Sequence, residues 1–117
     1  MNRTSRAHLN VEAHTHAGLS GKNNEDRFSV ASFTLDAQQT TPVLFAVLAD
    51  GIGGHKGGEV AAELAVNHIM ETIANSDGRH PQRIMQEAVT LASDAIAARA
   101  ADDENLKGMG STCAAAR

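Results

Sequence analysis

Asp50 is the residue of this sequence best placed for metal chemistry. It directly follows an unbroken apolar run, residues 43–49, and precedes a glycine-rich stretch, residues 51–58. A carboxylate at the end of a buried strand is ionised near neutral pH and needs a cation or hydrogen bonds to offset its charge. Mg²⁺ and Mn²⁺ prefer carboxylate and carbonyl oxygens, and Gly51 lets the backbone turn a carbonyl toward the same ion. Because Asp-Gly is also a very common turn pair, Asp50 taken alone favours a simple turn.

A second acidic site, Glu25-Asp26, lies in a polar break between two segments with strand character. If the strands beside this break flank the strand that ends at Asp50 in one sheet, the three carboxylates lie close together. Carboxylates gathered in this way repel one another unless metal ions lie among them, which is the arrangement used in two-metal hydrolysis. A solvated turn is the alternative for Glu25-Asp26 considered without Asp50.

The elements that would position these groups follow from hydrophobic periodicity. Apolar and β-favouring residues predict three strands, over residues 10–18, 27–35 and 43–49. The glycine-rich segment 50–58 predicts a loop. The turn-like residues 108–110 are followed by a short apolar stretch that predicts a further strand.

Two helices are predicted from apolar residues spaced three and four apart. They cover residues 59–75 and 81–101, and Pro81 suits the first position of the second helix. The stripe of the second helix runs through Ile84, Ala88, Leu91, Ala95 and Ala98. Strands mixed with these helices predict an α+β fold.

Composition narrows the class of protein. The 117 residues are 42% hydrophobic but only 3% aromatic, with no Trp or Tyr, so we expect a thin core. A net charge of -4 argues against a nucleic-acid partner bound mainly through phosphate neutralisation. Cys113 is the single cysteine and cannot form an internal disulfide, and an apolar core position is expected for it. The sequence has no secretory h-region and no apolar run long enough to span a bilayer, so a cytoplasmic location is expected.

Three ordered motifs carry a resemblance to a known family. They are Asn24-Glu25-Asp26, then Ala49-Asp50-Gly51-Ile52-Gly53-Gly54-His55 with Gly58-Glu59-Val60-Ala61, then Gly108-Met109-Gly110-Ser111-Thr112. In this order the sequence resembles the first three motifs of bacterial PP2C-type (PPM) metal-dependent protein serine/threonine phosphatases, from about Ala13 to the chain end.

The resemblance implies the N-terminal part of a four-layer α-β-β-α sandwich, in which helices flank two mainly antiparallel sheets. Residues 1–117 would form the N-terminal portion of one catalytic domain. The implied activity is hydrolysis of phosphoserine and phosphothreonine in proteins with two divalent ions, Mn²⁺ or Mg²⁺. Phosphoprotein substrates of serine/threonine kinases would be its partners.

Roles for individual residues are also implied by the resemblance. Asp50 would bridge the two metals, the Gly51 carbonyl would bind one of them, and Glu25 would hold a metal-bound water. Asp26 would accept a hydrogen bond behind these ligands. Many members have a phosphate-binding arginine where this chain has Gly21, so we expect the neighbouring Lys22 to neutralise substrate phosphate as a point charge.

Two further departures bear on catalysis. Animal members place a candidate general-acid histidine two residues after the bridging aspartate, where this chain has Ile52, and His55 is not assigned that role. The later family motifs with further metal-binding aspartates are absent from this sequence. We therefore expect the polypeptide to bind metal weakly and to show little phosphatase activity by itself.

Two other functions remain as alternatives. A nucleotide-binding module would need glycine where Lys56 stands, and neither Gly57 nor Gly58 is followed by the Lys and Ser or Thr of a Walker motif. A non-catalytic, phosphatase-like interaction module stays open.

His14 and His16 could face a metal from one side of a strand, but no further ligand lies at a recognisable spacing, so a solvated face is expected.

Overall fold

Two long antiparallel strands form the centre of the structure. The computed structural model describes all residues, 1–117. In it β2 (Asp26–Thr34) and β3 (Pro42–Ile52) pair along their whole length, from Asp26 opposite Asp50 to Thr34 opposite Pro42. The predicted strands over residues 27–35 and 43–49 are therefore confirmed, joined by the turn between Thr34 and Pro42.

Three short strands complete a five-stranded antiparallel sheet. At the N-terminus β1 (Asn2–Arg3) pairs with the end of β2, and it is too short for periodicity to predict. On the far edge of β3 lie β4 (Gly110–Ser111) and β5 (Ala114–Ala116). The last segment of the chain thus returns to the strand that carries Asp50.

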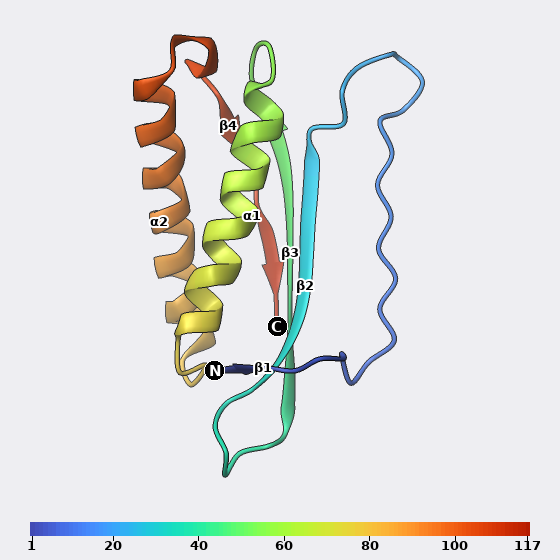
Figure 1. Cartoon of the computed structure of the whole chain (residues 1–117), viewed down its shortest axis with the longest axis vertical. Coiled ribbons are helices and arrows are strands. Elements are labelled where there is room, and N and C mark those ends of the chain that lie inside the picture. Colours follow the sequence, from blue (N-terminus) through green and yellow to red (C-terminus); the bar gives the residue numbers. More distant parts are fainter.

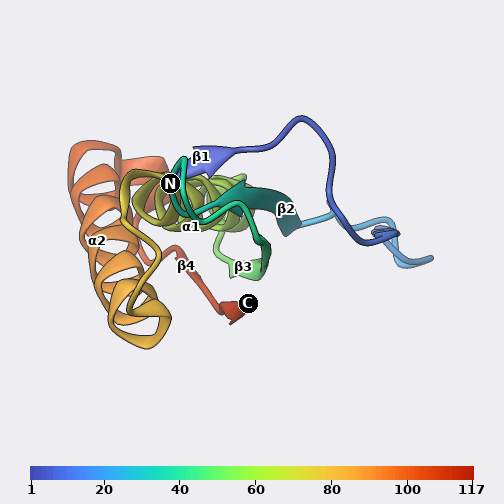
Figure 2. The same cartoon turned by 90° about the horizontal axis from the view of Figure 1, so that it is seen from below.

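Both helices cover the same face of the sheet (Figures 1 and 2). The first, α1 (Gly57–Asn75), packs on β2 and β3, and α2 (Pro81–Asp102) packs along α1 and is followed by the short 3₁₀ turn η1 (Glu104–Leu106). Neither α1 nor α2 combines the length and the apolar character needed to cross a membrane.

The core between sheet and helices is thin, as the composition predicts. Phe33 and Phe45 meet edge to face with their ring centroids 6.0 Å apart, and both are fully buried. Much of the remaining core is alanine, which removes little apolar area from water per residue. Leu91, predicted in the α2 stripe, is 45% exposed, because the buried face runs instead through Ile84, Ala88 and Ala92 at four-residue steps.

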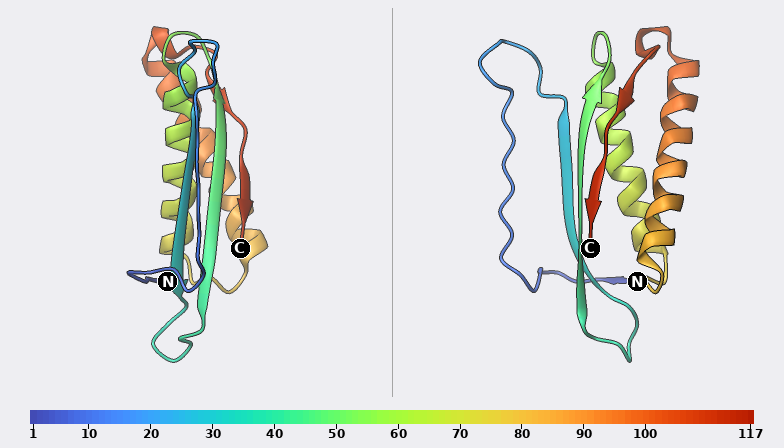
Figure 3. Two further views of the ribbon diagram at one scale, coloured as in Figure 1. Left: turned by 90° about the vertical axis from the view of Figure 1, so that its right-hand side faces the viewer. Right: turned by 180° about the vertical axis from the view of Figure 1, so that it is seen from behind.

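The opposite face of the sheet carries no helix (Figure 3). Side chains alternate along a strand, so the residues beside the buried Phe45 and Val47 point to this open face. Phe28, Leu48 and Ile52 lie there with exposed fractions of 40%, 54% and 63%. The α+β class is confirmed, and this chain supplies one helical layer and one sheet.

The predicted strand over residues 10–18 is wrong. This segment runs extended beside β2 without joining the sheet, and no backbone hydrogen bond ties it to another strand (Figure 1). The side chain of Asn24 holds it in place by donating a hydrogen bond to Thr15 Oγ1 at 2.8 Å. Alternation of apolar residues predicts which face a strand would bury, but a strand also needs a paired neighbour.

The glycine-rich loop is shorter than predicted. Strand β3 continues through Asp50 and Gly51 to Ile52, and α1 begins at Gly57, so only residues 53–56 form the connection. Cys113 was predicted in the core but is exposed between β4 and β5. Loss of solvation nevertheless raises the pKa of its thiol above the usual 9.0.

Candidate active site

Asp26 and Asp50 lie directly opposite each other at the end of the central hairpin. The Gly51 amide donates a hydrogen bond to the Glu25 carbonyl at 3.2 Å, just beyond this pair. That bond makes Asp26 and Asp50 a non-hydrogen-bonded pair, in which opposite side chains come closest, with Cβ atoms about 4.5–5.5 Å apart. Both side chains belong to the open face of the sheet, and Asp50 is exposed.

The charges of this pair are not compensated by the protein. Every hydrogen bond made by Asp50 uses its backbone, and the carboxylate of Asp26 accepts none. The ion pair of the chain joins Arg79 to Asp36 and lies elsewhere. Like charges placed directly opposite destabilise an antiparallel pair, so the hairpin end holds two free carboxylates in an unfavourable arrangement.

Glu25 lies at the same hairpin end, but its side chain faces the start of α1. A Cβ built on Gly58 would lie 2.3 Å from its carboxylate, so the Glu25 side chain lies against the start of α1. The Asn24 side chain accepts a hydrogen bond from the Asp26 amide at 3.0 Å, and Arg27 donates to the Asn24 carbonyl at 2.9 Å. These bonds fix the backbone from which the carboxylates of Glu25 and Asp26 project.

The predicted cluster of three carboxylates is only partly formed. All three line one open hollow of about 640 Å³, but no three His, Cys, Asp or Glu side chains are grouped so that they could hold one metal ion. Consecutive residues on an extended chain point to opposite faces, and this separates Glu25 from Asp26. The hairpin therefore brings together Asp26 and Asp50, with Glu25 beside them.

Glycines allow α1 to begin directly against the end of β3. A Cβ on Gly51 would lie 1.8 Å from the Gly58 carbonyl oxygen, and one on Gly53 would lie 3.0 Å from the Gly58 nitrogen. The Gly51 amide bonds to Glu25, but no bond returns from the Glu25 amide to the Gly51 carbonyl. This carbonyl oxygen, beside Asp50, has no hydrogen bond from β2.

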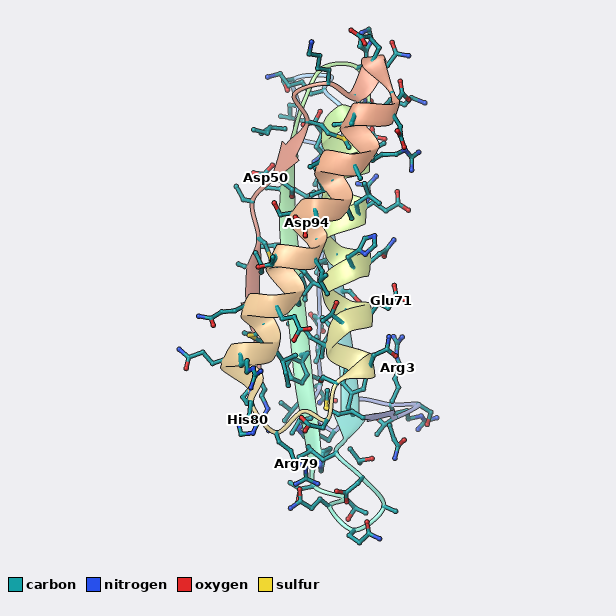
Figure 4. The ribbon with its side chains drawn as sticks, turned by 90° about the vertical axis from the view of Figure 1, so that its left-hand side faces the viewer. Arg3, Asp50, Glu71, Arg79, His80 and Asp94 are labelled. Carbon is teal, nitrogen blue, oxygen red and sulfur yellow. The ribbon has the colours of Figure 1, made fainter.

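The backbone of Asp50 is anchored by the third motif, a role that the sequence did not reveal. The Thr112 amide donates to the Asp50 carbonyl at 2.9 Å, and the Asp50 amide lies 3.3 Å from Thr112 Oγ1. Ser111 Oγ also donates to the Asp50 carbonyl, at 3.3 Å. Figure 4 shows Asp50 at this junction with β4. The only sequence signal for this anchoring role was the presence of two hydroxyl residues directly after a glycine turn.

Three basic or imidazole side chains line the hollow with the carboxylates: His16, Lys22 and His55. Lys22 was predicted near the site, whereas His16 was expected on a solvated face. His14, two residues earlier, lines a separate apolar cavity with Phe28. The two histidines therefore do not act together.

Comparison with known proteins decides the family. The sequence model of the family described as Protein phosphatase 2C matches residues 13–117. The chain belongs to the protein phosphatase 2C family. As a member of this family, it has the three ordered motifs of the sequence at the hairpin end, at the start of α1 and at the anchor of Asp50.

Similar proteins include two named bacterial phosphatases. Serine/threonine protein phosphatase PstP of Mycobacterium tuberculosis is 32% identical over 92% of this chain, and Serine/threonine phosphatase stp of Listeria innocua is 30% identical over 92% of it. This protein phosphatase 2C chain spans only 19% and 42% of those two proteins. The crystal structure of the Mycobacterium tuberculosis phosphatase PstP/Ppp matches 84% of this chain and 37% of its own, with a TM-score of 0.66 and 32% identity.

Proposed function

We propose that this chain is part of a metal-dependent phosphatase that removes phosphate from phosphoserine and phosphothreonine in proteins. The observation that carries the proposal is the pair of opposed, uncompensated carboxylates of Asp26 and Asp50. A fold gains nothing in stability from such a pair unless a cation offsets the repulsion. Family membership supports the same activity.

The residues of the hollow fit a hard divalent cation. The Asp50 carboxylate and the Gly51 carbonyl, with the carboxylates of Glu25 and Asp26 beside them, form an all-oxygen set, which suits Mg²⁺ or Mn²⁺. Asp50 and the Gly51 carbonyl would hold metal directly, Glu25 would do so through a water, and Asp26 would support them. Bound there, a pair of such ions lowers the pKa of a water and offsets phosphoryl charge.

The chain's own contribution is positioning. Thr112 and Ser111 hold the Asp50 backbone, and Asn24 holds the amide of Asp26, so both carboxylates have fixed origins. Lys22 lines the hollow and would offset the charge of the substrate phosphate. Its ammonium group lacks the two-pronged geometry of the arginine found in many family members at the position of Gly21.

Thermal unfolding with and without Mn²⁺ tests the metal site. Asp50→Asn removes one of two repelling charges, so the apo variant should melt slightly above wild type, by the equivalent of about 0.2–1 kcal/mol. Wild type should gain melting temperature in millimolar Mn²⁺, because a ligand of the folded state stabilises it by mass action. The melting temperature of Asp50→Asn should not rise when Mn²⁺ is added.

Asp94→Asn provides the matched control, because Asp94 is exposed on α2 and does not line the hollow. This variant should respond to Mn²⁺ as wild type does. Equal Mn²⁺ responses in wild type and Asp50→Asn would refute the metal site.

The alternative is a non-catalytic, phosphatase-like module, which is favoured by the absence of a three-residue ligand group within this chain. Hydrolysis of p-nitrophenyl phosphate with Mn²⁺ separates the two functions. The 117-residue chain should turn over slowly, and a longer form with the remaining family motifs should be fast. A longer form that binds Mn²⁺ without turnover would favour the module.

A further inference from the structure

The neutral ring of His16 is held in one tautomeric form by a nearby backbone amide. The Gly18 amide donates a hydrogen bond to His16 Nδ1 at 2.9 Å. A backbone amide can only donate, so Nδ1 carries a lone pair, and the neutral ring has its proton on Nε2. The free nitrogen of His16 is therefore a hydrogen-bond donor.

The ring is also held at the hollow. Thr15, its neighbour, accepts the hydrogen bond from Asn24, which itself positions Asp26. Gly18 and Gly21 have φ of +80° and +74°, the left-handed region that favours glycine, and they turn the chain back toward Glu25. His16 consequently lines the same hollow as the three carboxylates.

A phosphoryl group in this hollow needs hydrogen-bond donors, and its negative charge favours basic or imidazole groups among them. Gly21 offers no side chain, which leaves His16, Lys22 and His55 as the basic or imidazole groups. A hydrogen bond to a charged acceptor is about twice as strong as one between neutral groups. Of the three, His16 has its donor nitrogen assigned by a hydrogen bond at the other nitrogen.

We propose that His16 donates a hydrogen bond from Nε2 to a phosphoryl oxygen of the substrate, in place of part of the contact that Gly21 cannot make. The proposal rests on the proposed function, since it takes a phosphorylated substrate to bind beside Asp26 and Asp50. It assigns no such role to His14, which lines the separate apolar cavity with Phe28 and does not line the hollow.

Nuclear magnetic resonance of the 117-residue chain with labelled histidines tests the proposal, with Mg²⁺ and inorganic phosphate as the probes. Without phosphate, the ¹⁵N shifts of His16 should identify Nε2 as the protonated nitrogen. Phosphate in the presence of Mg²⁺ should then shift the Nε2 resonance saturably. His16→Ala should weaken phosphate binding about ten- to hundredfold, the range for a hydrogen bond to a charged group.

Two variants separate a specific contact from a structural effect. His14→Ala should leave phosphate affinity unchanged, and His16→Gln, which keeps an N–H donor, should recover part of it. The proposal is overturned if His16 carries its proton on Nδ1, if His16→Ala binds phosphate as wild type does, or if wild type shows no phosphate-dependent shift. In a uniformly ¹⁵N-labelled sample, changes in the backbone amide shifts of Asp26 and Asp50 on adding Mg²⁺ report the metal site separately, so their presence with an unchanged His16 would refute this contact alone.

Discussion

Gly51→Ala should destabilise the protein far more than an ordinary glycine substitution. The added Cβ would lie 1.8 Å from the Gly58 carbonyl oxygen, 2.5 Å from its carbonyl carbon and 2.9 Å from its Cα. All three are backbone atoms at the start of α1, so no side-chain rotation can relieve the overlap. Strand β3 and helix α1 would have to move apart.

The expected loss follows from the type of contact. Overpacking in a close-packed interior costs about 1–3 kcal/mol where side chains can adjust, so a backbone clash should reach at least about 3 kcal/mol. For a domain of this size, about 4 °C of melting temperature is lost per kcal/mol, which predicts a fall of roughly 12 °C. Stability of natural domains is about 5–15 kcal/mol, so the variant should still fold at low temperature.

A graded series provides the assay. Gly54→Ala is the control, since its Cβ would meet nothing within 4 Å, and Gly53→Ala is intermediate, with backbone atoms at 3.0–3.1 Å. Melting temperatures followed by circular dichroism should fall in the order Gly54→Ala, Gly53→Ala, Gly51→Ala, with the control close to wild type. If Gly51→Ala and Gly54→Ala melted together, the close approach of α1 to β3 would be refuted.

Two further predictions concern anchors away from the carboxylates. Thr112→Val removes the hydroxyl beside the Asp50 amide, so it should lower the free energy of unfolding, measured in urea, by about 0.5–1.5 kcal/mol and weaken Mn²⁺ binding. Thr90→Val is the control: it removes a hydroxyl hydrogen bond to the Gln86 carbonyl within α2 and should leave Mn²⁺ affinity unchanged. The pKa of Asp36 is lowered below 3.8, chiefly because the Gln39 amide donates to its carboxylate, with Gln38 and Arg79 adding to the effect. Its ionised form therefore stabilises the fold above pH 3.8, so Asp36→Asn should lower the melting temperature at pH 7. The difference in melting temperature between wild type and Asp36→Asn should shrink as the pH falls below 3.8, and a constant difference would contradict this assignment.

The helices and the central hairpin could be predicted because each has a local signal. The stripe from Ala61 to Ile73 and the apolar run ending at Ala49 depend only on which side of an element meets the core. Residues 10–18 carry an equally clear alternation, yet they form no strand, because pairing depends on a neighbouring edge that local sequence does not describe.

The candidate site was predictable in its members but not in its geometry. Asp26 and Asp50 could be named from the sequence, whereas their direct opposition depends on the register of β2 and β3. Alternation of side chains along the extended chain then directs Glu25 toward Gly58 and away from Asp26. The role of Ser111 and Thr112 could not be predicted, since their partner lies 61 or 62 residues earlier in the chain.

That sequence separation sets an order of assembly during synthesis. The hairpin that opposes Asp26 and Asp50 is local and can form as soon as both strands have left the ribosome, because short loops close at low entropic cost. The anchor on the Asp50 backbone must wait until Thr112, 62 residues later, has emerged. A nascent chain thus presents its two repelling carboxylates before the Asp50 backbone is anchored, and the Asp50 side of the site becomes rigid last.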